Sequence, residues 1–125
     1  MKITPVLFVD AIEPSLPFWV DRLGFTKTVE VPEGDRLGFA MLIHGPAEIM
    51  LQTRASLEKD LPALLDLARP SGCLFIEVED FADLLRRVDG CEVVVPVRDT
   101  FYGMREIVVR EPGGHSLCFA ARIQT

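Results

Sequence analysis

The sequence has few of the residues that build metal sites, disulfide frameworks or nucleophilic centres. Its 125 residues include three cysteines and two histidines. The odd number of cysteines, without C-x-x-C spacing, argues against both a disulfide framework and a zinc site. No serine stands in a G-x-S-x-G setting, and no glycine-rich loop has phosphate-binding spacing. We therefore expect reduced thiols, and the sequence assigns no catalytic residue.

Long apolar runs and an excess of positive charge are also missing. No segment approaches the roughly 18–20 uninterrupted apolar residues of a membrane span, and Asp10 interrupts the N-terminal run that a signal peptide would need. Against 13 Lys and Arg stand 19 acidic residues, a formal net charge of -6, whereas nucleic-acid binding needs a cationic face. We expect a cytoplasmic protein that binds neither membrane nor nucleic acid. The charge favours a cationic ligand, although it also serves solubility alone.

A strand followed by a helix opens the chain. β-branched and aromatic residues at 3–10 predict a strand. In residues 11–25, Pro14 and Pro17 suit only a first helical turn, and Gly24 suits a C-terminal stop. This segment therefore predicts a helix.

The same unit returns in the second half. Residues 73–80 predict a strand, and residues 80–90 predict a helix that Asp80 caps and Gly90 ends. Three strand candidates follow each helix, at 26–31, 37–44 and 47–53 in the first half and at 91–97, 104–110 and 115–121 in the second. Each half reads β-α-β-β-β, which indicates an internal duplication.

We interpret the chain as a single α+β domain of residues 1–125 that consists of two modules. The first module spans about residues 1–54 and the second about residues 71–125. The leucine-rich segment at about 55–70 predicts a linker helix that stops before Pro70.

Alternation along the strands predicts which side chains share a face. A turn centred on Gly45 and Pro46 pairs Phe39 with Gln52 and Met41 with Met50, so these four side chains lie together. In the strand at 73–80, Cys73, Phe75 and Glu77 lie opposite Leu74, Ile76 and Val78. We expect the purely aliphatic face to meet the helix.

Two registers are open for the last hairpin, because Gly113 and Gly114 permit two turn lengths. A two-residue turn puts Arg105 and Ile107 on the face of Cys118. A three-residue bulged turn puts Met104, Glu106 and Val108 there instead, and we favour this form.

Three segments carry a resemblance to a known family. They are "PVL" at residues 5–7, "FWVDRLGF" at 18–25 and "REIVVREPGGHSLCFAA" at 105–121. With them, nearly the whole chain resembles the vicinal-oxygen-chelate superfamily, which includes glyoxalase I, extradiol dioxygenases and, most similar here, the bleomycin-resistance proteins. The resemblance implies tandem βαβββ modules, each a curved half-barrel sheet with a helix on its outer face. For drug-binding members it also implies a homodimer with exchanged N-terminal strands and clefts between subunits.

In the metal enzymes of this superfamily, four equivalent strand positions hold the ion. The resemblance places them here at Thr4, Gln52, Cys73 and Cys118, and none is a histidine or a carboxylate. Because a hydroxyl and a neutral amide are weak donors for a divalent ion, we expect no metal and no cofactor. A zinc site on the two thiolates is the alternative, but two ligands would be missing.

A ligand-binding face remains as the candidate site. Apolar side chains with few polar groups are typical of small-molecule sites, and methionine adapts to planar ligands. The predicted ligand-binding residues are Thr4, Phe39, Met41, Met50, Gln52, Cys73, Phe75, Phe101, Tyr102, Met104 and Cys118. Many of these would serve equally as core, and residues 101–103 as a structural turn.

Three functions compete at this point. The first is a homodimer that sequesters a bleomycin-like or other bulky, aromatic and cationic antibiotic without a metal. The second is a metal-dependent lyase of the glyoxalase type, or a dioxygenase. The third is a regulatory or structural dimer with a vestigial cleft. We favour the first.

Overall fold

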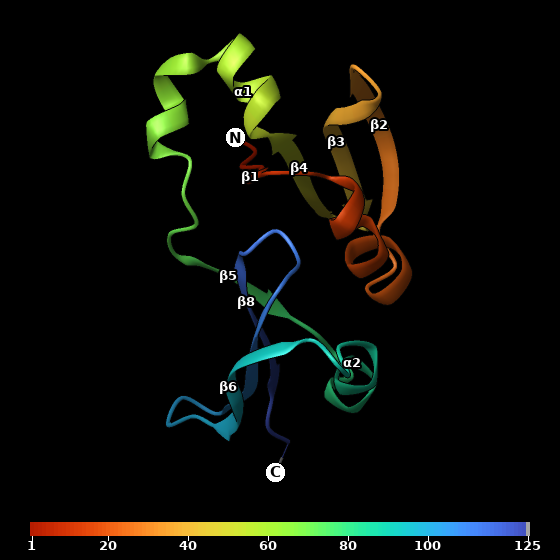
Figure 1. Cartoon of the computed structure of the whole chain (residues 1–125). Helices are drawn as coiled ribbons and strands as arrows, with labels where there is room; N and C mark the ends of the chain where they lie inside the picture. Colours follow the sequence, from red (N-terminus) through yellow and green to blue (C-terminus); the bar gives the residue numbers. More distant parts are fainter. Residues whose placement is uncertain (125) are drawn as a thin grey trace. The chain divides into compact units, whose positions relative to one another are not determined.

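The structure is a computed structural model of the chain, and it describes residues 1–124. It divides between Pro70 and Ser71 into two compact units. Each unit contains one four-stranded mixed sheet. Among the described residues, the first unit has several short helices and the second has one, α2 (Phe81–Arg87), as Figure 1 shows. The predicted α+β fold of two tandem βαβββ modules is confirmed.

The first sheet contains β1 (Val6–Val9), β2 (Thr26–Glu33), β3 (Arg36–His44) and β4 (Ala47–Thr53). Its strand order is β1-β4-β3-β2, with β1 parallel to β4 and the other neighbours antiparallel. A parallel pair needs a long crossover, which the helical segment and the β2–β3 hairpin supply. Gly45 has φ 55° in the turn before β4, a conformation that glycine adopts without steric cost. The predicted pairing of Phe39 with Gln52 and of Met41 with Met50 is confirmed.

The first helical segment differs in type from a regular α-helix. It consists of a 3-10 helix, Glu13–Ser15, and a π-helix, Pro17–Arg22. Pro17 has no backbone N–H, so an α-helical hydrogen bond from that residue to the preceding turn cannot form. The Leu23 N–H bonds the Phe18 carbonyl at 3.1 Å, and Gly24, at φ 81°, ends the segment as predicted.

One face of the first sheet forms a core. The buried side chains on it are Leu7, Val9, Ala40, Leu42, Ile49 and Leu51. Trp19 in the π-helix is completely buried and contacts Phe18 and Phe25 edge to face, at ring-centroid distances of 5.4 and 5.2 Å. The alternation of β3 and β4 therefore leaves the opposite face of the sheet outside this core.

The linker forms two helices instead of the single helix that we predicted. Thr53 caps the α-helix α1 (Arg54–Asp60), because its Oγ1 accepts the Ser56 N–H at 3.1 Å. A 3-10 helix, Pro62–Leu67, follows. Leu61 separates them with φ -137° and ψ 64°, outside the helical region, as expected for the residue that precedes a proline.

The second module repeats the first. It contains β5 (Cys73–Glu77), α2 (Phe81–Arg87), β6 (Glu92–Asp99), β7 (Met104–Arg110) and β8 (Ser116–Arg122). Its strand order is β5-β8-β7-β6, with β5 parallel to β8. The same order and the same parallel pair occur in both sheets, which agrees with the predicted duplication.

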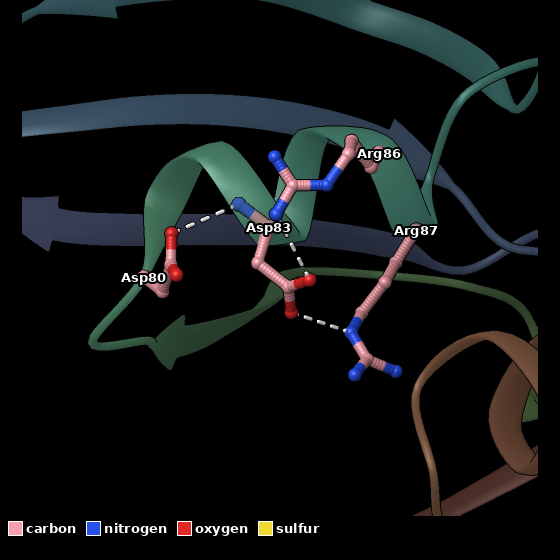
Figure 2. A network of polar contacts seen from close by, with 4 residues as sticks. All are labelled: Asp80, Asp83, Arg86 and Arg87. Carbon is pink, nitrogen blue, oxygen red and sulfur yellow. Dashed lines mark hydrogen bonds and ion pairs between the residues drawn. The ribbon is translucent and has the colours of Figure 1, made fainter.

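Helix α2 has the predicted cap and a local charge network (Figure 2). Asp80 Oδ1 accepts the Asp83 N–H at 2.9 Å, and Gly90 follows the helix at φ 84°. Asp83 accepts from Arg87 at 2.7 Å and from Arg86 at 3.3 Å, so one carboxylate binds two arginines that lie one helical turn further along the helix.

Within residues 1–124, no helix has the length and apolar character that crossing a membrane requires.

Candidate functional site

Each sheet has one face outside its core, and most of the predicted site residues lie on these faces, whereas Thr4, Phe101 and Tyr102 lie outside the strands. The first open face lies on the first sheet and consists of Val6, Phe8, Val29, Val31, Phe39, Met41, Met50 and Gln52. Phe39, Met41 and Met50 are half-buried. This face is apolar and partly accessible, whereas the opposite face of the same strands is closed.

Four members of the first open face were missed in the sequence, namely Phe8 and three exposed valines. Val6, Val29 and Val31 are 39%, 43% and 49% exposed, and the last two lie opposite Met41 and Phe39. The signal was present, because alternation in the strand at 26–31 places both valines on one side. Their exposure extends the apolar surface to the edge strand.

The polar residues of the first module have partners of their own. The Thr4 hydroxyl donates to Glu48 Oε1 at 2.9 Å, and Lys2 contacts Glu48 Oε2 at 3.1 Å. The Lys2 ammonium and then the Thr4 hydroxyl hold the pKa of Glu48 below its usual value. Gln52, at 9% exposure, donates from Nε2 to Ser56 Oγ at 3.3 Å. Thr4 and Gln52 therefore have different hydrogen-bond partners.

The last hairpin takes the bulged register that we favoured. Val108 pairs with Cys118 and Glu106 with Ala120. The turn closes with Gly114 at φ 94° and the Glu111 N–H bonded to the His115 carbonyl at 2.9 Å, as in a three-residue hairpin loop. Met104, Glu106 and Val108 thus share the face of Cys118.

The second open face lies on the second sheet. It consists of Cys73, Phe75, Glu77, Met104, Glu106, Val108, Cys118 and Ala120. Phe75 is 57% exposed, while Met104 and Cys118 are buried. Most side chains of the second open face are apolar, and the carboxylates of Glu77 and Glu106 are its acidic groups.

Glu106 is the buried charge of this face, and the sequence did not give it a role. It is 2% exposed. Its Oε1 accepts from Arg98 at 3.0 Å, and its Oε2 accepts from the Tyr102 hydroxyl. This carboxylate raises the pKa of Tyr102, chiefly by accepting that hydrogen bond. Arg98 lies eight positions away along the chain, and a bulge in β6 between Val95 and Arg98 brings it opposite Glu106.

The two predicted thiols differ in environment. Cys73 is exposed and pairs with Ser116, whereas Cys118 is buried and pairs with Phe75. Burial, followed by the negative charge of Glu106, raises the pKa of the Cys118 thiol from 9.0 to about 11. Cys118 is therefore a protonated thiol at neutral pH.

The aromatic turn, defined as Phe101 and Tyr102, joins β6 to β7. Phe101 is 100% exposed and Tyr102 48% exposed. Their rings meet edge to face at 5.1 Å, and Gly103 follows at φ 82°. The hydrogen bond from the Tyr102 hydroxyl to Glu106 connects this turn to the second open face, and the Phe101 ring is exposed to solvent.

The four side chains that the resemblance places at the metal-ligand positions are poor ligands for a divalent ion. The Thr4 hydroxyl is bonded to Glu48, Gln52 could offer only a neutral amide oxygen, the buried Cys118 thiol holds its proton at neutral pH, and Cys73 is an exposed thiol. Divalent ions in such folds need deprotonated or imidazole ligands. In residues 1–124, no group of three or more His, Cys, Asp and Glu side chains has the arrangement of a metal site.

A separate depression of about 540 Å³ lies beside α2. It is lined by Phe81, Ala82, Leu85, Val97, Arg98, Asp99 and Arg105. None of the predicted site residues lines it. Two of its charges, Arg105 and Asp99, already pair at 2.7 Å.

Solved structures share this fold over almost the whole chain. A bleomycin-binding protein from bleomycin-producing Streptomyces verticillus, in complex with copper(II)-bleomycin, is 26% identical, with a TM-score of 0.65 over 97% of this chain and 95% of that one. A glyoxalase/bleomycin resistance protein/dioxygenase family enzyme from Burkholderia phytofirmans is 18% identical, with a TM-score of 0.78 over 96% and 97%. A lactoylglutathione lyase from Agrobacterium tumefaciens is 15% identical, with a TM-score of 0.75 over 97% and 92%. The last two likenesses show the fold alone.

The sequence also matches a family. No curated protein matches the chain. The sequence profile of the glyoxalase/bleomycin resistance protein/dioxygenase superfamily matches residues 3–119, which include the first two segments that carried the resemblance and all but the last two residues of the third. The order of strands, the parallel β1–β4 and β5–β8 pairs and this match agree. The chain belongs to the glyoxalase/bleomycin resistance protein/dioxygenase superfamily.

Proposed function

We propose that this protein binds a bulky, partly aromatic small molecule without a metal and sequesters it unchanged. The observation that carries the proposal is an accessible apolar sheet face in each module, on which Phe75 is 57% exposed and Val31 49% exposed. Exposed apolar side chains that share one face commonly mark a binding or interaction site. Bleomycin is the leading ligand, and the binding form is a homodimer in the cytoplasm.

The donor chemistry supports binding in preference to metal-assisted catalysis. Thr4, Gln52 and Cys118 stand where metal enzymes of the superfamily carry ligands, and each is neutral at pH 7. Sequestration needs no stabilised transition state. It requires only that the bound drug be withheld from its target.

The relatives support the choice of ligand. The structure from Streptomyces verticillus is of a bleomycin-binding protein with copper(II)-bleomycin bound. The formal net charge of -6 suits a cationic antibiotic of that kind. Methionines at positions 41 and 50 suit a planar group, because their side chains adapt to irregular shapes.

Calorimetric titration tests the proposal directly. Metal-free and copper-loaded bleomycin are each added to the protein at micromolar concentration, and we expect a saturable heat with at least one of them. Ligand at about 100 times its dissociation constant should also stabilise the fold by about 2.7 kcal/mol. An absence of both heat and thermal stabilisation would refute the antibiotic as ligand. The same absence across a broad ligand library would favour the regulatory or structural dimer.

A pair of variants locates the binding face. Phe75→Ala removes an exposed aromatic ring from the second open face, and we expect it to weaken binding by more than about 1 kcal/mol, as aromatic anchors do. Leu61→Ala is the matched control, because Leu61 is 48% exposed but lies in the linker. Equal effects of the two changes would contradict binding on this face.

The metal-dependent lyase or dioxygenase is tested by metal content. Purified protein that holds a stoichiometric divalent ion, and that loses an activity on chelation, would replace our proposal with that one. We expect less than stoichiometric metal.

Sedimentation analysis measures the oligomeric state independently, and we expect a dimer.

A further inference from the structure

Glu106 and Arg98 form an ion pair whose two halves are unequally exposed. The Glu106 side chain is 3% exposed and the Arg98 side chain 56% exposed, with 3.0 Å between Oε1 and the guanidinium nitrogen. The anion is held in place by the sheet and by the Tyr102 hydroxyl. The arginine side chain, in contrast, leaves into water easily, because most of it is already hydrated.

A buried carboxylate without its cation is strongly unfavourable. If Arg98 moves away, Glu106 keeps neutral donors, the Tyr102 hydroxyl and the Cys118 thiol, but loses the cation paired with its Oε1. Any cation that fits the same place then gains the interaction that Arg98 gives up. The position of the guanidinium group thus marks a place where a positive charge is stabilised.

Aromatic rings and a second acid stand near this place. Tyr102 contacts Glu106, and Phe101 contacts Tyr102. Aromatic faces attract organic cations, particularly planar ones that also donate hydrogen bonds. Glu77 lies in the same cross-strand row, separated from Glu106 by Ala120, so the row contains two acids and one arginine.

We infer that the second open face contains a recognition site for a planar organic cation, of the amidinium or guanidinium class, which the protein's own Arg98 occupies in the absence of ligand. The ligand's cation displaces Arg98 and pairs with Glu106, while its ring packs against the aromatic turn. This inference rests on the proposed function, because it treats the second open face as a ligand-binding face. It adds the chemical class that the face selects and the residue that competes for it.

Benzamidine is the probe, because it combines a planar amidinium group with a phenyl ring. Its dissociation constant is measured by calorimetry and by chemical-shift titration on the wild type and on Arg98→Ala. Since the variant lacks the competing guanidinium group, we expect it to bind benzamidine at least about tenfold more tightly. The double variant Arg98→Ala/Glu106→Gln should lose this gain, because the carboxylate is gone.

Arg110→Ala is the matched control. Arg110 pairs with Glu92 at 2.6 Å, and both side chains are exposed, at 46% and 64%, so its removal leaves no buried charge. We expect wild-type affinity for benzamidine in this variant. Near-UV circular dichroism checks that each variant is folded, and Arg98→Gln supplies the same comparison should Arg98→Ala not fold.

The outcomes separate this inference from the proposed function. Benzamidine binding that is no tighter in the Arg98 variant than in the wild type, or that survives Glu106→Gln, overturns the cation site. Bleomycin binding by the wild type together with that result leaves the proposed function standing. Tighter benzamidine binding in the variant without any bleomycin binding retains the cation site and removes the antibiotic.

Discussion

Val108 lies directly opposite Cys118 across β7 and β8. Because side chains alternate along each strand, this single pairing also places Glu106 and Met104 on the face of the thiol. A shift by one residue would bring Arg105 and Ile107 to that face and would bury no carboxylate there. The charge chemistry of the second module follows from this register.

Loss of Arg98 should destabilise the fold more than loss of an exposed arginine. We expect Arg98→Ala to lower the free energy of unfolding by about 1–3 kcal/mol at pH 7, because it leaves the buried Glu106 without its cation. Arg110→Ala should cost at most about 1 kcal/mol, the usual value for an exposed pair. Urea denaturation measures both, and equal losses would contradict the unequal burial of the two acids.

The Cys118 thiol should resist alkylation until strongly alkaline pH. Its pKa is raised from 9.0 to about 11, and only the thiolate reacts. In a Cys73→Ser/Cys91→Ser background, iodoacetamide labelling followed by mass spectrometry should rise only as the pH approaches 11. Rapid labelling of the folded protein at pH 8 would disprove this.

The same thiol should make the fold sensitive to high pH. A raised pKa in the folded state means that the folded protein keeps the proton that the unfolded chain gives up. The contribution to stability is complete below pH 9.0 and is lost as the pH rises toward about 11. Denaturation midpoints of the wild type and Cys118→Ser should therefore diverge in this interval, with the wild type losing more. If the two proteins lost stability equally as the pH rises, the raised pKa of Cys118 would not be the cause.

Asp80 should stabilise the start of α2. Its carboxylate accepts the Asp83 N–H at 2.9 Å, and we expect Asp80→Ala to cost about 1 kcal/mol because that donor loses its partner. Asp80→Asn keeps an acceptor oxygen and should cost much less. Urea denaturation compares the two, and equal losses would show that the cap hydrogen bond is not the cause.

Asp83 provides a test at acid pH. The Arg87 guanidinium hydrogen bond is the main cause that holds the pKa of Asp83 below its usual 3.8. A lowered pKa contributes stability above the value of the unfolded chain, and this is lost as the pH falls through the folded value. In a carboxyl NMR titration, Arg87→Ala should raise the pKa of Asp83 toward 3.8. An unchanged titration would contradict the contact in Figure 2.

Gly38 should not tolerate a side chain. A Cβ at this position would lie 2.8 Å from Glu33 Cβ and 3.2 Å from Ser56 Cβ. Since both atoms are close to the backbone, they cannot move aside cheaply, and Gly38→Ala should cost about 1–3 kcal/mol. A loss below about 0.5 kcal/mol, as for a typical surface change, would contradict this packing.

By itself the sequence determined the strand pattern, the duplication, the superfamily and the pairing of Phe39 with Gln52, since alternation and a glycine turn are local properties of the chain. Only the tertiary structure decided how the first helix and the linker fold around Pro17 and Leu61. It also decided the register at Cys118 and the meeting of Arg98 with Glu106. The register and the ion pair depend on a bulge and a turn length that are fixed only when neighbouring strands pair. The helix types depend on how the chain packs around prolines, which lack a backbone N–H. Burial then distinguishes Glu106 and Glu111, each 2% exposed, from the acidic residues that lie at the surface.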